Sequence, residues 1–390
     1  MTTIDGEVAP GFEPVREAFM ANFARHGDIG AAVCVYQDGR PVVDLWGGIA
    51  DPETGRPWTR DTLQLVYSAT KGATATAAHM LAERGALDLD APVAKYWPEF
   101  AANGKADIPV RWLLSHQAGL VALDQPVPLN EALAWYPMAA ALAAQRPLWT
   151  PGTAHGYHGR TWGWLVGEVI RRVSGRSPGR FFADEIAAPL GLDFFIGLPA
   201  EERDRVSRMV YQRPEVDLTT VPAESLPEEL RELVAAWCDP DSFSNRAYAV
   251  THPAAIDFDS PEVQAAELPA SNGISSARGL ARMYAALIGE VDGVRLLTPE
   301  TLASATKEQA SGKDQVILIP SRFSSGYMLP TATNPMTGPN AFGHTGRGGS
   351  LGFADQELGV TFGYVMNHII GGADDVRAVS IVEAVRKSLA

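Results

Sequence analysis

The chain has 390 residues, of which 46% are hydrophobic and 20% are charged. This is the composition of a globular protein, and the length suggests two or three cores or one large domain with an insertion. The net charge of −14 at pH 7 argues against a nucleic-acid or anionic-membrane partner, because the negative field repels phosphate groups.

Two cysteines, Cys34 and Cys238, are too few and too far apart for a structural zinc site or a disulfide framework. The first ten residues contain neither the basic nor the apolar region of a secretion signal. No uninterrupted apolar stretch reaches the roughly 18 residues that a membrane-spanning helix needs. We therefore expect a cytoplasmic protein without a membrane partner. No feature of the sequence indicates an oligomeric state.

Helix and strand patterns alternate near the N-terminus. Apolar residues at spacings of three and four predict an amphipathic helix over residues 12–25. Two β-rich runs, 31–36 and 41–46, flank Asp38-Gly39. They predict a β-hairpin, because that dipeptide tolerates the positive φ of a tight turn.

A strand-like piece over 63–67 leads directly into a segment of small and apolar residues, 68–82. Lys71 is the only charged residue of this segment. A helix so poor in charge is expected to be buried nearly all round.

Residues 85–265 are interpreted as mostly helical or irregular, and the acidic, Pro-rich part from 201 to 265 as a lid-like excursion. One clear helix is expected over 161–173, where Ser174-Gly175 ends it. A second helix is expected over 277–287. The remaining predictions are three strands and a final helix, at 325–329, 352–354, 360–367 and 374–389.

Strands therefore cluster at both ends of the chain, and helices lie between them. We predict an α/β (α+β) fold, with one antiparallel sheet built from both termini and flanked by helices. The predicted sheet domain is discontinuous, over 1–84 and 266–390, and the inserted, mostly helical domain covers 85–265.

The strongest local motif is Ser68-Ala69-Thr70-Lys71. In a helix the side chains at i and i+3 share a face, so the Ser68 hydroxyl and the Lys71 amine converge. Burial lowers the pKa of a lysine toward that of the neutral base that can take a serine proton. The same tetrapeptide recurs at 304–307, in a polar context that predicts a solvated helix end without a catalytic role.

A competing nucleophile is Ser350, in a Gly-x-Ser-x-Gly pattern over 348–352. That pattern marks a nucleophile when a strand precedes it and a helix follows it. A strand-like segment follows Ser350 instead, so we reject Ser350 as the nucleophile.

Metal and cofactor sites are not predicted. His155 and His158 have no acidic ligand nearby, and Asp374-Asp375 is interpreted as the acidic first turn of the last helix. No Gly-rich nucleotide-binding loop is present. The aromatic group Trp135, Tyr136, Trp149, Trp162 and Trp164 is interpreted mainly as core.

Taken together, the motifs identify a resemblance to the class C β-lactamase-related serine hydrolases, and among them to the family VIII carboxylesterases. It implies a β-lactamase or penicillin-binding-protein-like fold. Five motifs match in order: Tyr-Ser-Ala-Thr-Lys-Gly (67–72), Leu-Leu-Ser-His-Gln-Ala-Gly-Leu (113–120), Pro-Gly-Thr-Ala-His-Gly-Tyr-His (151–158), Ser-Asn-Gly-Ile-Ser-Ser-Ala-Arg (271–278) and Gly-His-Thr-Gly-Arg-Gly-Gly-Ser (343–350).

The resemblance implies that Ser68 is the acylated nucleophile, that Lys71 is its partner, and that Tyr157 takes and returns the serine proton as a phenolate. The alternative for Tyr157 is a buried aromatic ring with a satisfied hydroxyl. The backbone N–H groups of Ser68 and Arg347 would form the oxyanion hole.

The resemblance also assigns His344 and Gly346, in the third motif, to substrate binding. His116 falls in a family landmark that is not catalytic, so a structural role is expected.

Two departures separate the sequence from the lactamases. Gly159 stands where they have an asparagine that contacts the lactam amide, and His344 where they have a lysine. Arg347 compensates in part for that lysine. We therefore predict a serine carboxylesterase for neutral, short-acyl esters, and no cofactor. The alternatives are a β-lactamase or transacylase with the same residues, and a binding protein that has lost turnover.

Overall fold

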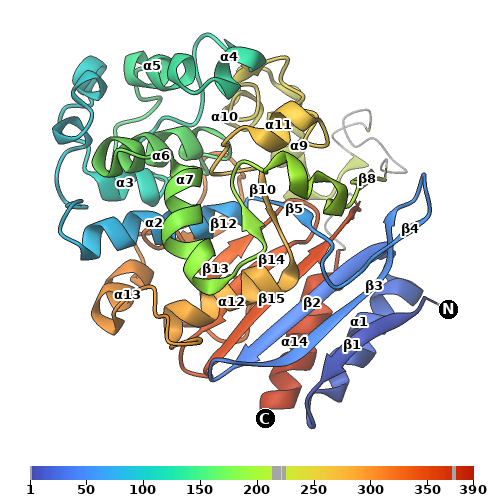
Figure 1. Cartoon of the computed structure of the whole chain (residues 1–390). Coiled ribbons are helices and arrows are strands. Elements are labelled where there is room, and N and C mark those ends of the chain that lie inside the picture. Colours follow the sequence, from blue (N-terminus) through green and yellow to red (C-terminus); the bar gives the residue numbers. More distant parts are fainter. Residues whose placement is uncertain (1, 213–220, 222–224, 371–374) are drawn as a thin grey trace.

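The computed structural model describes residues 2–212, 221, 225–370 and 375–390, apart from the side chains of residues 228 and 229. A large antiparallel sheet lies beside a helical region, and both chain ends lie on the sheet side (Figure 1). In the described chain, no helix is long and apolar enough to cross a membrane.

The main sheet is built from both ends of the sequence, as predicted. Its strand order is β1-β3-β2-β15-β14-β13, with the short β4 paired to β3, and every pairing is antiparallel. The predicted hairpin turns at Asp38 and Gly39, which have φ of 49° and 76°. The strands are β1 (Ile4–Val8), β2 (Gly30–Gln37), β3 (Arg40–Asp51), β4 (Arg56–Pro57), β13 (Phe342–Thr345), β14 (Leu351–Asp355) and β15 (Val360–Met366).

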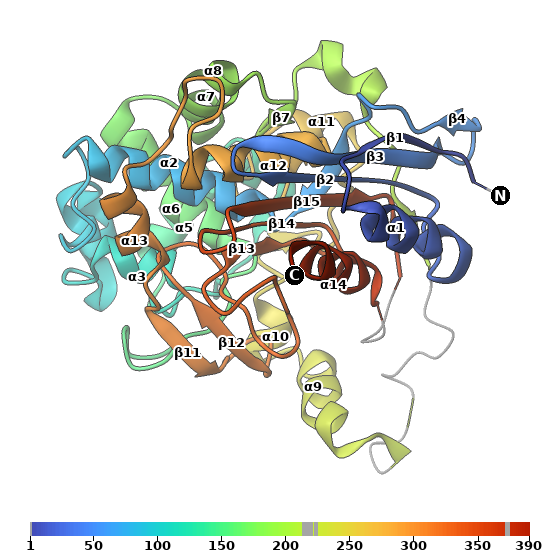
Figure 2. The same ribbon diagram turned by 90° about the horizontal axis from the view of Figure 1, so that it is seen from below.

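Helices cover both faces of this sheet (Figure 2). The helices α1 (Glu13–Arg25) and α14 (Arg377–Leu389) pack together on one face. On the other face α12 (Ala277–Ile288) packs against β2, β14 and β15. Val15 and Phe19, two of the apolar residues that predicted the first helix, are buried in α1.

Helix α2 (Thr70–Glu83) lies between the sheet and the helical region, and every residue from Thr70 to Leu81 is buried. It follows β5 (Gln64–Tyr67), which pairs with β10 (Gly273–Ser275). β10 in turn pairs with β7 (Phe194–Phe195). A segment of the predicted insertion therefore shares a small sheet with strands of the predicted sheet domain. The division into two domains stays a prediction.

The helical region contains the predicted helix as α6 (Thr161–Ser174), which ends at Gly175 in the left-handed conformation, with φ of 71°. Its other elements are short. They are α3 (Val110–Leu114), β6 (Val127–Pro128), α4 (Leu129–Leu133), α5 (Tyr136–Ala144), α7 (Pro178–Phe182), α8 (Ala188–Leu190), β8 (Val210–Tyr211), α9 (Glu228–Cys238), α10 (Phe243–Arg246), β9 (Thr251–His252) and α11 (Pro261–Ala265).

The strand predicted at 325–329 is wrong. The segment is irregular, with an isolated bridge at Met328, and Tyr327 is buried. The residues are apolar because they enter the core, and burial alone does not require strand pairing. The strands near this point are β11 (Ala310–Lys313) and β12 (Pro320–Phe323), after α13 (Pro299–Thr306).

The last helix begins at Arg377, later than predicted, after the short β16 (His368–Ile369). Asp374 lies outside the described residues. Asp375 precedes the helix, and its carboxylate lies 2.6 Å from the buried Arg377 guanidinium. Asp375 is therefore an ion-pair partner of Arg377 and does not form the first helical turn.

Candidate active site

Ser68 lies in a tight turn between β5 and α2, at the junction of the sheet and the helical region. The residue before it, Tyr67, has a positive φ of 46°, which a non-glycine residue adopts at a local cost in free energy. This turn leaves Ser68 partly exposed next to the N-terminus of α2, while its neighbours on both sides are buried.

Lys71 is fully buried on the first turn of α2. Its Nζ lies 3.3 Å from Ser68 Oγ, 2.9 Å from the Gly159 carbonyl oxygen and 3.1 Å from the Ala270 carbonyl oxygen. No carboxylate in the described chain forms an ion pair with it, and burial lowers its pKa well below the usual value. Nζ is the donor in all three contacts. In its neutral form the amine would keep the two carbonyl contacts and offer its lone pair to the Ser68 hydroxyl.

Tyr157 lies beside this pair, and its ring centre is 4.8 Å from Lys71 Nζ. Its backbone N–H donates a 2.9 Å hydrogen bond to Oδ1 of the buried Asp314, which anchors the residue. Burial raises the pKa of Tyr157 above its usual value, and a side-chain hydrogen bond with Ser68 only partly opposes this. Burial therefore favours the neutral hydroxyl, while the phenolate that the resemblance implies stays a prediction.

Buried histidines pack around Tyr157. His158 accepts a hydrogen bond from the Leu120 N–H at Nε2, 3.0 Å away, and its Nδ1 lies 2.7 Å from the Gly156 carbonyl oxygen. Burial lowers the pKa of His158 to about 3, so the ring is neutral. Its backbone N–H donates to His116 Nδ1. In the part of the chain that the structure describes, no group of side chains suited to hold a metal ion is found.

The third motif lies on β13 and in the turn after it. His344 is buried, its Nδ1 lies 2.7 Å from the Thr345 carbonyl oxygen, and burial lowers its pKa to about 3. Its Nε2 has no hydrogen-bond partner among the described residues. At Gly346 a β-carbon would overlap the Val66 carbonyl oxygen, so only glycine lets this turn approach β5 so closely.

That close approach places Arg347 at the same cavity as Ser68. Neither the Ser68 nor the Arg347 backbone N–H donates to another part of the described chain. Both amides are therefore available to a ligand.

The cavity has a volume of about 470 Å³, and four aromatic residues line it, namely Tyr67, Trp237, Tyr248 and Phe258. Its other lining residues are Ser68, Gly159, Arg160, Ser271 and Arg347. His344 lies outside this lining. Sequence reasoning missed the aromatic residues and Arg160, although the position of Arg160 directly after Tyr157-His158-Gly159 was a usable signal.

The other two candidate serines lie elsewhere. Ser304 is exposed near the end of α13, and Lys307, which is also exposed, follows that helix. Ser350 is buried in the turn before β14, so the motif around it leads into a strand, as predicted.

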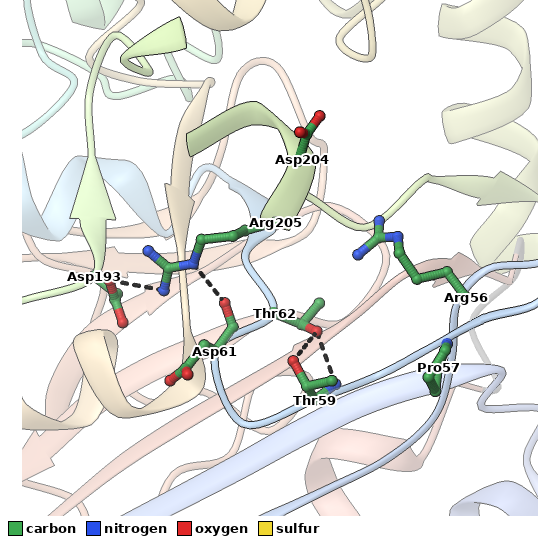
Figure 3. A pocket seen from close by; sticks show the side chains of 8 residues that line it. All are labelled: Arg56, Pro57, Thr59, Asp61, Thr62, Asp193, Asp204 and Arg205. Carbon is green, nitrogen blue, oxygen red and sulfur yellow. Dashed lines mark hydrogen bonds and ion pairs between the residues drawn. The ribbon is translucent and has the colours of Figure 1, made fainter. Parts of the chain in front are cut away.

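A separate polar hollow of about 620 Å³ lies between β4, β5 and β7 and includes Asp61, Thr62, Asp193 and Arg205 (Figure 3). Arg205 lies 2.9 Å from the Asp193 carboxylate and donates to the Asp61 carbonyl oxygen at 3.0 Å. Its lining includes no serine, lysine or tyrosine, so it lacks the residue types of the predicted Ser68 site.

Comparison with known proteins agrees with this geometry. A family model described as Beta-lactamase matches residues 15–386. The chain belongs to the β-lactamase family. Within this family it is 37% identical to the Esterase/beta-lactamase LipL of Mycobacterium tuberculosis (strain ATCC 25618 / H37Rv), over 99% of this chain and 88% of LipL.

Two solved structures share nearly the whole fold. A family VIII carboxylesterase is 40% identical, with a TM-score of 0.85 over 99% of this chain and all of that chain. EstA from Arthrobacter nitroguajacolicus Rue61a is 35% identical, with a TM-score of 0.86 over 99% of this chain and 98% of that chain. These β-lactamase-family relatives carry esterase names, and the predicted fold class and family are confirmed.

Proposed function

We propose that this chain is a serine carboxylesterase in which Ser68 becomes acylated. The observation that carries the proposal is the buried Lys71 amine, which is 3.3 Å from Ser68 Oγ, has no carboxylate partner in the described chain and has a lowered pKa. A neutral amine in this position is the base that a serine nucleophile needs. The esterase names of whole-length relatives support the same reaction.

In the proposed reaction the Ser68 oxygen forms a bond to the ester carbonyl carbon while its proton passes to Lys71. The N–H groups of Ser68 and Arg347 stabilise the oxyanion. When the C–O bond to the alcohol breaks, the alkoxide takes the Tyr157 hydroxyl proton, which the Lys71 ammonium replaces. Water then attacks the acyl-enzyme by the same route in reverse. His344 and Gly346 remain predicted substrate-binding residues. Their proposed contribution is the shape of the turn in which they lie.

We expect esters to be better substrates than β-lactams because of the cavity wall beside Gly159. A β-carbon at this position would lie 3.1 to 3.2 Å from the Tyr248 ring, so the ring occupies the space of a larger side chain. No side-chain amide is therefore available here for a lactam. We expect kcat/KM for p-nitrophenyl butyrate to exceed that for nitrocefin by about a hundredfold or more. Equal efficiencies would favour the β-lactamase alternative.

The deciding experiment is intact-mass measurement after reaction with a p-nitrophenyl alkylphosphonate, followed by peptide mapping. The proposal requires one adduct, on Ser68. An adduct on Ser304 or Ser350 would overturn it. The short-acyl preference and the cytoplasmic location stay predictions.

A further inference from the structure

Two arginine side chains, Arg160 and Arg347, line the cavity that contains Ser68. The lining includes no acidic residue, and neither arginine forms an ion pair within the described chain. One Arg160 nitrogen donates to the Ala254 carbonyl oxygen at 2.7 Å, which fixes the side chain without neutralising it. The Arg347 side chain is exposed.

The two guanidinium groups also act on each other. The pKa of Arg160 is lowered to about 10, mainly by burial and in smaller part by the positive charge of Arg347. Arg160 therefore stays protonated at neutral pH, and its guanidinium shares one cavity with that of Arg347.

Arg205, in the hollow of Figure 3, shows the usual arrangement in this protein. It lies 2.9 Å from the Asp193 carboxylate and 2.6 Å from the Glu202 carboxylate. Acidic residues outnumber basic ones, at 46 against 32, so carboxylate partners are plentiful. Against that background, two arginines without an ion-pair partner among the described residues form a local site for an anion.

We propose that the cavity selects esters that carry a carboxylate, which Arg160 and Arg347 bind while Ser68 attacks the ester carbonyl. The inference rests on the proposed function. It replaces the neutral esters expected from His344 and Gly159 with esters that carry a carboxylate. Arginine suits the task, because its planar fork donates paired hydrogen bonds to a carboxylate. The rings of Tyr67, Trp237 and Phe258 offer apolar contact to the carbon chain between the two groups.

The test compares two p-nitrophenyl esters with the same six-carbon acyl chain, mono-p-nitrophenyl adipate and p-nitrophenyl hexanoate. They differ in a terminal carboxylate against a terminal methyl group. We expect kcat/KM for the adipate to be about tenfold higher or more in the wild type, and this preference to shrink as salt is added. Arg160→Gln and Arg347→Gln should each lower the adipate-to-hexanoate ratio by about tenfold.

A matched control is Arg180→Gln. Arg180 is 70% exposed, pairs with Asp184 and lies outside this cavity, and its removal changes the net charge equally. The ratio should stay at the wild-type value in this variant. Arg160→Lys, which keeps the charge but not the fork, should retain part of the preference.

A second arm places the carboxylate on the alcohol side, with 4-acetoxybenzoate and its methyl ester as the pair. The two leaving groups differ in acidity. We therefore compare the ratio of kcat/KM for 4-acetoxybenzoate to kcat/KM for its methyl ester in each variant with the same ratio in the wild type. A tenfold loss confined to this arm would place the anion on the alcohol side and still support the proposal.

If the wild type prefers hexanoate to adipate and no arginine variant lowers the ratio in the second arm, the proposal is wrong. Ratios that the arginine variants leave unchanged would also overturn it. In either case, hydrolysis of hexanoate with acylation of Ser68 would leave the proposed esterase function intact. If no ester is hydrolysed, both ideas fail.

Discussion

The sequence Ser-Ala-Thr-Lys occurs twice in this chain, in two opposite environments. The first copy, 68–71, follows a buried strand and opens α2, in which every residue from Thr70 to Leu81 is buried. The second copy, 304–307, closes α13, with both its serine and its lysine exposed.

The difference lies in what surrounds each lysine. Lys71 is out of water, with two carbonyl oxygens and the Ser68 hydroxyl around its amine. Lys307 is exposed to water. The spacing of serine and lysine is the same in both copies, so burial and the carbonyl acceptors are what make the first a candidate for catalysis.

The largest expected effect separates the two serines. Ser68→Ala should lower kcat/KM for p-nitrophenyl butyrate by about a thousandfold or more, because no acyl-enzyme can form. Ser304→Ala changes the same atom in the other copy and should leave kcat/KM within about twofold of the wild type. Steady-state kinetics on both purified variants measure this contrast. Substantial turnover in Ser68→Ala would contradict the assignment.

The second contrast concerns the lysines. Lys71→Ala should lower kcat by about a hundredfold or more, as loss of a general base does, whereas Lys307→Ala should not change it. Tyr157→Phe should lower kcat by a similar factor, because the same proton passes through Lys71 and Tyr157.

The double variant Lys71→Ala/Tyr157→Phe tests that coupling. It should lose much less than the product of the two single losses, since either change already breaks the proton path. Multiplicative losses would mean that the two residues act separately.

Local features of both copies were predictable from the sequence, because they depend on neighbours in the chain. The absence of other charge near Lys71 predicted its burial, and the polar residues after Lys307 predicted its exposure. In the same way Asp38-Gly39 predicted the hairpin turn. The five ordered motifs allowed the whole fold to be predicted, because they carry the resemblance to a known family.

Features that depend on tertiary structure were not predictable in this way. Tyr248 and Phe258 reach Ser68 from about 180 positions along the chain, and nothing in their local pattern indicates a cavity. The raised pKa of Tyr157 follows from burial that only the folded chain reveals. The apolar run at 325–329 predicted a strand, because a short buried segment and a short paired strand have the same apolar sequence pattern.

The pH dependence gives a third way to compare the copies. Lys71 is active only as the neutral amine, and burial puts its pKa well below the usual value. As pH falls through that lowered pKa, kcat/KM should drop about tenfold per unit, while activity stays level from there into the alkaline range. The pH profile of Lys307→Ala should overlay that of the wild type. An acid limb near the usual pKa of a lysine would show that Lys71 is charged at neutral pH and would remove it as the base.

The smallest effect is one of stability, at the residue that follows each copy. At Gly72 a β-carbon would overlap the hydroxyl oxygen of Tyr284, a buried residue of α12. Gly72→Ala should therefore lower the free energy of unfolding by about 1–3 kcal/mol, the usual cost of overpacking a core. Glu308 is half-exposed and pairs with Arg322, so Glu308→Ala should cost about 1 kcal/mol or less.

A second substitution identifies the cause of the Gly72 effect. The Tyr284 hydroxyl has no hydrogen-bond partner in the described part of the chain, so Tyr284→Phe removes the overlapping atom without breaking a bond. Urea unfolding should show that Gly72→Ala/Tyr284→Phe recovers most of the stability lost in Gly72→Ala. If the double variant is no more stable than Gly72→Ala alone, contact with Tyr284 is not the cause. The tight packing of α2 against α12 would then not be what distinguishes the first copy from the second.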